Sequence, residues 1–279
     1  MAYPMTRNTL KVPGATLYYE VRGSGPVLLM IPGGPTDASV FAGLSDALAD
    51  RYTTVAYDPR GNSRSVLDGP PEDQRLDVHG DDAHHLLAAV TSEPAYVLGS
   101  SGGAQIGLDL AARHPERVRT LVAHEPPAVE LLPDAARHRA LMREVYDTYR
   151  KEGVGPAMRK FEEGIGMGGE DDEVPPPMDP GAEMPEDMAR IIANLEFFIA
   201  HGARPLSGYV PDVAALRSGS TRVVVGVGEA SAGQLAHRTA LALAERLGTD
   251  PVTFPGDHAG YGSHPAAFAE TLHKVLSGG

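Results

Sequence analysis

The sequence contains no cysteine. Disulfides, thiolate nucleophiles and cysteine-ligated metal centres are therefore excluded. It also lacks a long apolar run, because no stretch approaches the length of a membrane span. Residues 1–10 are polar and offer no apolar segment of the kind that a signal peptide requires. We therefore expect a soluble, cytoplasmic protein.

Basic residues are scarce. The 24 lysines and arginines are outnumbered by 37 aspartates and glutamates, which gives a formal net charge of -13. A surface of this sign repels polyanions, so neither nucleic acid nor an anionic membrane is an expected partner. We expect a small-molecule substrate instead. The sequence leaves the oligomeric state open, with a homodimer as one alternative.

Apolar residues, in contrast, are plentiful enough for a large core. The chain has 279 residues, 42% of them hydrophobic, which suits one large α/β domain or such a core with one insertion. Apolar runs predict strands, and they alternate with helical patterns in a way typical of a parallel, doubly wound sheet. The predicted strands are residues 9–12, 16–21, 27–31, 53–57, 96–98, 120–123, 222–227 and 251–254.

The alternation stops after residue 130 and resumes near residue 221. Helical patterns cover residues 136–151, 155–163 and 186–200, and this region contains no convincing strand. The stretch 164–185 is rich in Gly, Pro, Met and acidic residues and predicts a mobile loop. We therefore predict a core of residues 1–130 and 218–279 with a helical lid inserted at 131–217.

The segment around which the chain is organised is residues 94–103, which contains the pattern G-x-S-x-G with Ser101 at its centre. An apolar strand before it and a helical pattern after it predict a sharp strand-to-helix turn. On such a turn the backbone is strained and the serine hydroxyl projects from the sheet. Ser101 is therefore the candidate nucleophile. Ser100 could replace it only if the turn shifted by one residue, which Gly99 and Gly103 disfavour.

A serine hydroxyl needs a base within hydrogen-bond reach. His258 is the best candidate because it follows the last predicted strand in a glycine-flanked loop, at the end of the sheet where parallel strands build sites. We expect a core or interface role for His124. The other histidines are interpreted as surface residues: His79, His84, His85, His114, His138, His201, His237, His264 and His273.

Four short motifs follow predicted strands in order. They are Pro32-Gly-Gly-Pro35, Asp58-Pro-Arg-Gly61, Gly99-Ser-Ser-Gly-Gly103 and Gly256-Asp-His258. With them the chain resembles the α/β-hydrolase superfamily over residues 10–130 and from 221 to the C-terminus. The resemblance implies an α/β-hydrolase fold, with a mostly parallel sheet and a helical lid.

The resemblance also implies roles for individual residues. Ser101 becomes the nucleophile and His258 the base, and the backbone amides of Gly34 and Gly102 form the oxyanion hole. Amides on glycine-rich turns can approach a developing oxyanion closely, so the residues themselves agree with this assignment. No cofactor and no metal is expected.

Three positions depart from the family pattern. Pro32 stands where a histidine is usual, and Ser63 replaces a usual glycine after Asn62; both changes affect loop shape more than chemistry. The third departure is Ser231, which occupies the position where most family members carry the triad acid. A serine cannot stabilise an imidazolium as a carboxylate does.

The acid must therefore come from another position. Glu125 follows the strand after the nucleophile helix, where haloalkane dehalogenases and fungal zearalenone lactonases of this superfamily place an acid. We favour Glu125, with Glu229 as its main rival because Glu229 ends the strand after the lid. Asp257 adjoins His258, but neighbouring side chains diverge, so it is interpreted as structural. Asp58 and Arg60 are interpreted as a structural pair that braces their loop.

These residues predict a serine hydrolase that cleaves a carboxylic ester or lactone through an acyl-enzyme. The Met and aromatic content of the lid suggests a moderately large apolar substrate. The lid side chains that could line a pocket, or only pack the lid, include Met142, Tyr146, Phe161, Asn194 and Phe198. Two alternatives remain open: non-hydrolytic Ser-His chemistry without a cofactor, of the perhydrolase, lyase or oxygenase type, and a catalytically decayed ligand-binding module.

Overall fold

The computed structural model describes residues 3–166 and 186–278. Its centre is a sheet of nine strands in the order β1-β2-β4-β3-β6-β7-β8-β9, with β5 paired to β2 outside this path. The strands are β1 (Thr6–Val12), β2 (Ala15–Gly23), β3 (Val27–Ile31), β4 (Thr53–Tyr57), β5 (Val66–Leu67), β6 (Ala95–Ser100), β7 (Val118–His124), β8 (Arg222–Gly228) and β9 (Val252–Phe254).

All strands from β4 through β3, β6, β7 and β8 to β9 pair in parallel, whereas β2 runs antiparallel to β1, β4 and β5. The apolar runs in β3 and β6 are almost entirely buried because helices cover both faces of the sheet. The arrangement confirms the predicted fold class. It also places β7 directly beside β6, so that the residues following these two strands are neighbours.

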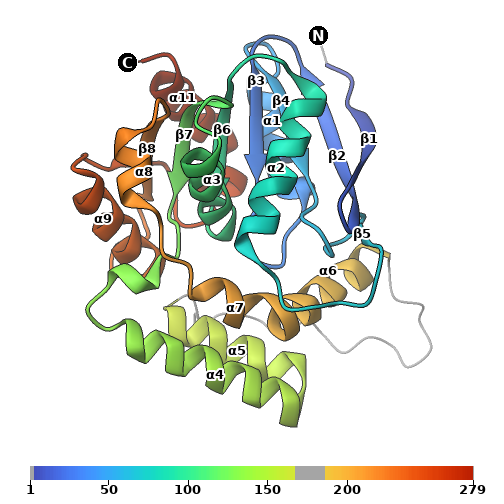
Figure 1. Cartoon of the computed structure of the whole chain (residues 1–279), viewed down its shortest axis with the longest axis vertical. Helices are drawn as coiled ribbons and strands as arrows, with labels where there is room; N and C mark the ends of the chain where they lie inside the picture. Colours follow the sequence, from blue (N-terminus) through green and yellow to red (C-terminus); the bar gives the residue numbers. More distant parts are fainter. Residues whose placement is uncertain (1–2, 167–185, 279) are drawn as a thin grey trace.

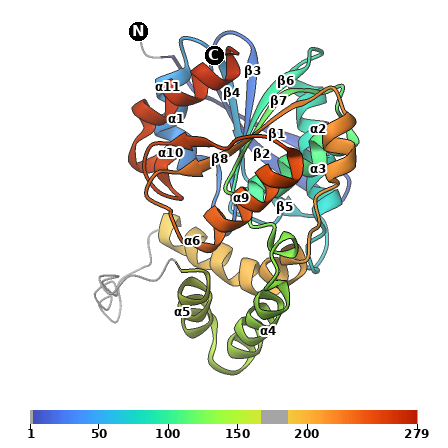
Figure 2. The ribbon, with the colours of Figure 1, turned by 90° about the vertical axis from the view of Figure 1, so that its left-hand side faces the viewer.

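Helices cover the sheet in two layers (Figures 1 and 2). One face packs against α2 (Leu76–Val90), α3 (Gly102–Arg113) and α9 (Leu235–Leu247), and the other packs against α1 (Ala42–Leu48) and α11 (Pro265–Leu276). The remaining core helices are short: η1 (Ala38–Phe41), η2 (Val129–Leu131) and α10 (Gly260–Ser263). None of the helices in the described ranges has the length and apolar character needed to cross a bilayer.

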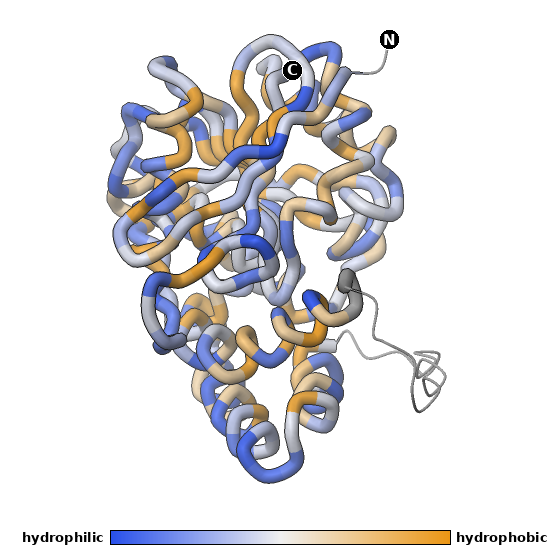
Figure 3. Tube along the Cα trace, turned by 90° about the vertical axis from the view of Figure 1, so that its right-hand side faces the viewer, coloured by the Kyte–Doolittle hydropathy of each residue, from blue (hydrophilic) through white to orange (hydrophobic). Residues whose placement is uncertain are grey.

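The predicted lid region forms α4 (Ala135–Glu152), α5 (Val154–Ile165), α6 (Glu186–Phe197), a π-helical turn (Phe198–Gly202) and α7 (Ala203–Ser207). These helices lie below the sheet, at the end away from both termini (Figure 1). The turn that joins α4 and α5 is hydrophilic (Figure 3). From residue 167 on, the predicted mobile loop lies outside the described residues.

The last helix of the predicted lid range, α8 (Val213–Ser218), does not belong with the others. It packs against α3 and α9, and Leu216 lies in the hydrophobic cluster of the core. The division at 131–217 stays a prediction, but its C-terminal helix is associated with the core.

Candidate active site

Ser101 occupies a sharp turn between β6 and α3. Its φ is 55° and its ψ is -126°, and its backbone N–H donates to the carbonyl of His124 at 2.9 Å. A side chain at Gly99 could not be accommodated, because a Cβ there would lie 2.3 Å from the carbonyl oxygen of Gly103. The strand, turn and helix thus have the arrangement that the G-x-S-x-G pattern predicts.

The loop after β3 packs directly against this turn. A Cβ on Gly33 would lie 2.5 Å from the carbonyl oxygen of Ser100 and 2.6 Å from the amide nitrogen of Gly102. Gly34 has a φ of 58°, and a Cβ on Gly102 would lie 3.5 Å from the Gly34 nitrogen. The two amides predicted to form the oxyanion hole therefore border the same space, next to Ser101.

Glu125 and His258 are in direct contact at this edge of the sheet. Glu125 Oε2 lies 2.6 Å from His258 Nδ1, and Gly228 N–H donates to Oε1 at 2.9 Å. The glutamate is fully buried, and the His258 side chain is 14% exposed. Burial alone would raise the pKa of Glu125, but the bonds from His258 and Gly228 outweigh it and lower the pKa to about 2. Glu125 is therefore ionised at neutral pH.

The contacts in the structure distinguish Glu125 from the other residues considered for the position of the triad acid. Glu229 is exposed, and its backbone N–H donates to the Phe254 carbonyl at 2.9 Å. Asp257 accepts from the Ala259 amide at 2.9 Å, as expected for a structural turn residue. Ser231 is fully buried, and its hydroxyl has no hydrogen-bond partner among the residues that the structure describes. Of the acids considered from the sequence, Glu125 is the one that contacts His258.

His124 connects the two halves of the site. Its carbonyl accepts from Ser101, and its ring lies 6.3 Å from the ring of His258, centroid to centroid. Its Nδ1 lies 3.1 Å from Ser100 Oγ, so the Ser100 hydroxyl is committed to the interior. Burial lowers the pKa of His124 to about 4. His124 lies in the core, as predicted. Ser101 and His258 both lie next to His124.

Backbone strain is concentrated at this edge. In the described part of the chain, the non-glycine residues with positive φ are Ser63 at 47°, Ser101 at 55° and Glu125 at 47°. Such conformations are costly for residues with a side chain and persist only where surrounding contacts hold them. Two of the three are predicted catalytic residues. The third, Ser63, is the departure from a usual glycine after Asn62, and its positive φ explains why glycine is usual there.

The predicted Asp58–Arg60 pair is wrong. Arg60 instead binds the buried Asp82, with Nε–Oδ2 and Nη2–Oδ1 distances of 2.7 and 2.5 Å. Asp58 accepts from Arg64 Nε at 2.7 Å and from the Ala38 amide at 3.0 Å. Asp58 therefore does brace a loop, but through Arg64. The sequence could not select the partner, because both arginines lie in the short segment that follows Asp58, and the one that binds it is the more distant, six residues along the chain.

Two histidines interpreted as surface residues are buried. His79 Nε2 lies 3.1 Å from Gln74 Oε1, and burial lowers the pKa of His79 to about 3. His138, near the start of α4, lies 3.4 Å from Asp134. Both occupy the inner faces of helices, and a single polar residue on such a face gives no signal in the sequence.

The lid side chains proposed for a pocket mostly contact one another. Met142, Phe161 and Phe198 belong to one hydrophobic cluster of the lid, and the two phenylalanine rings meet edge to face at 5.3 Å. Tyr146 lies under the guanidinium of Arg204, 4.3 Å from it. Asn194 alone of the five is buried against the α/β core, where it binds Ser63. Their roles toward a substrate stay predictions.

One group of described side chains has the composition of a metal site. His84, His114 and Glu116 place ligand atoms within 4.8 Å of one another. The imidazole rings, however, are stacked at 3.9 Å with an interplanar angle of 24°. Ring lone pairs lie in the ring planes, so these two run nearly parallel and do not converge on one ion. The 12-residue helix α3, about 18 Å long, separates this group from Ser101.

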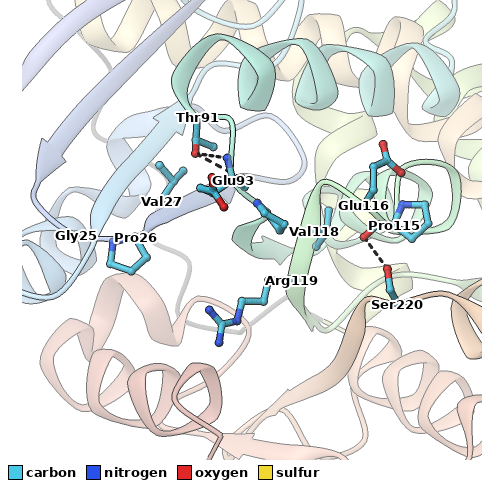
Figure 4. A pocket seen from close by; sticks show the side chains of 11 residues that line it. Gly25, Pro26, Val27, Thr91, Glu93, Pro115, Glu116, Val118, Arg119 and Ser220 are labelled. Carbon is cyan, nitrogen blue, oxygen red and sulfur yellow. Dashed lines mark hydrogen bonds between the residues drawn. The ribbon is translucent and has the colours of Figure 1, made fainter.

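A cavity of about 700 Å³ lies at the opposite edge of the sheet (Figure 4). It is lined by the first residues of β3 and β7, Val27 and Val118, and by Thr91, Glu93, Arg119 and Ser220 among others. Ser220 Oγ donates to the Pro115 carbonyl at 3.2 Å. The cavity contains none of the predicted site residues.

Comparison with known proteins agrees with this geometry. Residues 26–161 match the family model described as the alpha/beta hydrolase fold. Over 278 residues the chain is 38% identical to the uncharacterized hydrolase YraK of Bacillus subtilis (strain 168), covering 98% of this chain and 96% of YraK. The protein therefore belongs to the α/β-hydrolase family, as the motifs indicate.

Solved structures show the same fold. A thermophilic esterase from Thermogutta terrifontis, solved with malate bound, superposes with a TM-score of 0.72 at 19% identity, covering 98% of each chain. The enol-lactonase from Burkholderia xenovorans LB400 gives a TM-score of 0.68 at 18% identity, covering 97% of this chain and 100% of its own. At these identities the likeness establishes the architecture.

Proposed function

We propose that this protein is a serine hydrolase that cleaves a carboxylic ester or lactone through an acyl-enzyme. The observation that carries the proposal is the 2.6 Å contact between buried Glu125 and His258, at the same edge of the sheet as the Ser101 turn. Ser101 is the N-cap residue of α3 and makes no side-chain capping bond to that helix, so capping does not occupy its hydroxyl.

In the proposed reaction, His258 accepts the Ser101 proton as the hydroxyl attacks the substrate carbonyl. Ionised Glu125 fixes the His258 ring through Nδ1 and offsets the charge of the imidazolium. The amides of Gly34 and Gly102 stabilise the oxyanion. Collapse of this intermediate breaks the ester C–O bond, and protonated His258 donates its proton to the departing alkoxide oxygen. Water then attacks the acyl-enzyme with neutral His258 again as the base. The acyl group leaves as the carboxylic acid, and Ser101 regains its proton from His258. The Glu125–His258 contact argues against a decayed site.

The size of the substrate remains a prediction. Met142, Phe161 and Phe198 pack into the lid itself, so their apolar character does not by itself argue for a large apolar substrate. A series of p-nitrophenyl esters of graded chain length, together with several lactones, would define the preferred acyl group and decide between ester and lactone.

A fluorophosphonate probe tests the nucleophile. We expect the wild type to be labelled and Ser101→Ala to lose both labelling and at least about 10³-fold in kcat. The control is Ser100→Ala, which removes the neighbouring hydroxyl that faces His124 and should still be labelled. Folded wild-type protein that is neither labelled nor active on any ester or lactone would contradict the proposal.

A further inference from the structure

Ser63 is held in its unusual conformation by the lid. Its φ of 47° belongs to the left-handed region that favours glycine. Asn194 of α6 binds it through both ends of one amide: Ser63 N–H donates to Asn194 Oδ1 at 2.7 Å, and Asn194 Nδ2 donates to Ser63 Oγ at 2.8 Å. Asn194 is only 2% exposed and Ser63 is half-buried, so the Asn194 amide is shielded from water on its own side of these bonds.

The same helix covers the neighbouring glycine. A Cβ on Gly61, whose φ is 79°, would lie 2.3 Å from the ring of Phe197, one turn along α6 from Asn194. The lid therefore contacts the loop after β4 at two positions, once through a ring and once through an amide.

That loop in turn holds the loop after β3. Ser63 Oγ donates to Asp37 Oδ2 at 2.7 Å, and Asn62 Nδ2 donates to the Thr36 carbonyl at 3.0 Å. Asp37 also accepts from the Ser39 amide at 2.9 Å. A continuous chain of hydrogen bonds thus runs from Asn194 through Ser63 to the segment that carries Gly34.

We propose that Asn194 is a positioning residue for the oxyanion hole: by holding Ser63, it fixes the loop that presents the Gly34 amide to the reacting carbonyl. This inference rests on the proposed function. Asn194 does not touch the substrate in this role. It therefore affects the transition state, in which the oxyanion exists, more than substrate binding.

A kinetic double-mutant cycle tests the inference. Asn194→Ala should lower kcat about 10- to 100-fold and leave KM within about threefold, because a displaced oxyanion donor weakens mainly transition-state binding. In a Ser63→Gly background, where glycine adopts the positive φ unaided, the same substitution should cost less than about threefold. An equal cost in both backgrounds, or a rise in KM alone, would mean that Asn194 acts on the substrate, and the inference would be wrong.

A second measurement does not depend on activity. Hydrogen exchange of the amides in residues 33–38 should be at least fivefold faster in Asn194→Ala. The matched control is Glu196→Ala, an exposed residue of the same helix that binds Tyr149 Oη at 3.2 Å and should change neither exchange nor kcat. If the exchange rates are unchanged in Asn194→Ala while turnover still requires Ser101, this inference is wrong and the proposed function stands. If turnover survives Ser101→Ala, the proposed function is wrong, and the catalytic role of Asn194 falls with it.

Discussion

The two edges of the central sheet contrast in how polar groups and empty space are distributed. At the carboxyl edge, a buried carboxylate, an imidazole and three strained non-glycine residues are held by hydrogen bonds from several loops. At the amino edge, a cavity of about 700 Å³ is lined by chain turns and by side chains such as Glu93 and Arg119. None of the described non-glycine residues with positive φ lines this cavity.

The cavity and the proposed active site thus lie at opposite ends of the strands, so this cavity does not mark the proposed site. Burying a charge and holding a backbone in a sparsely populated conformation both oppose folding. Such costs are retained where a geometry is needed, so we interpret the carboxyl edge as the functional one. A cavity at the amino ends of the strands carries no comparable cost in the free energy of folding.

The largest expected effect separates the two acids of the carboxyl edge. Glu125→Gln should lower kcat about 10³-fold, because a neutral amide can neither offset the imidazolium nor enforce the tautomer of His258. Exposed Glu229→Gln should change kcat less than about twofold. Steady-state kinetics of both variants on one activated ester measures the difference. The reverse order of effects would transfer the acid to Glu229.

The next effect concerns the close packing beneath the Ser101 turn. A Cβ on Gly103 would lie 2.0 Å from the carbonyl oxygen of Ile31, a backbone atom that cannot move aside. Gly103→Ala should therefore lower the free energy of unfolding by about 3 kcal/mol. Gly262→Ala is the matched control, because its Cβ would meet nothing closer than 4.0 Å. Urea denaturation measures both, and equal midpoints would show that the turn is loosely packed.

A buried imidazole should make stability depend on pH. Burial lowers the pKa of His124 from 6.5 to about 4, so between these values the unfolded chain binds a proton that the native protein does not. The free energy of unfolding should thus fall as the pH drops from 6.5 to 4, with a share of about 3 kcal/mol from His124. His79, whose pKa burial lowers to about 3, adds to the same trend.

The His124→Asn variant isolates the contribution of His124 to this pH dependence of stability. Asparagine keeps a polar group opposite Ser100 but does not titrate, so the slope of unfolding free energy against pH should become shallower than in the wild type. His85→Asn, which replaces an exposed imidazole, serves as the control. Identical slopes for the wild type and His124→Asn would mean that the ring is not shielded from water.

The smallest expected effect comes from the amino edge. Arg119 lies over the Tyr96 ring at 5.4 Å and lines the cavity. Arg119→Ala should leave kcat/KM within about twofold, because the cavity lies at the opposite ends of the strands from Ser101. A loss of more than about tenfold would show that the amino edge contributes to function, and the contrast between the edges would not hold.

Much of the fold could be predicted from the sequence. The predicted boundaries of β3 and β4 match the structure. For β3 the local signal is a fully apolar run flanked by Gly and Pro. The two-residue β5 and the four-residue α10 were missed, since segments that short carry no periodicity. The predicted helix over residues 186–200 changes to a π-helical turn at Phe198, a feature that hydrophobic spacing does not encode.

The sequence by itself determined the order of most strands and helices, the strained serine turn and the short group of residues that could act as base or acid. These properties depend on apolar spacing and on glycine at turns, both of which are local. Only the tertiary structure decided which acid meets His258, which arginine binds Asp58 and which residue of α6 binds Ser63. The Glu125–His258 and Ser63–Asn194 contacts join residues 133 and 131 positions apart. Such pairings are set by the packing of the whole chain.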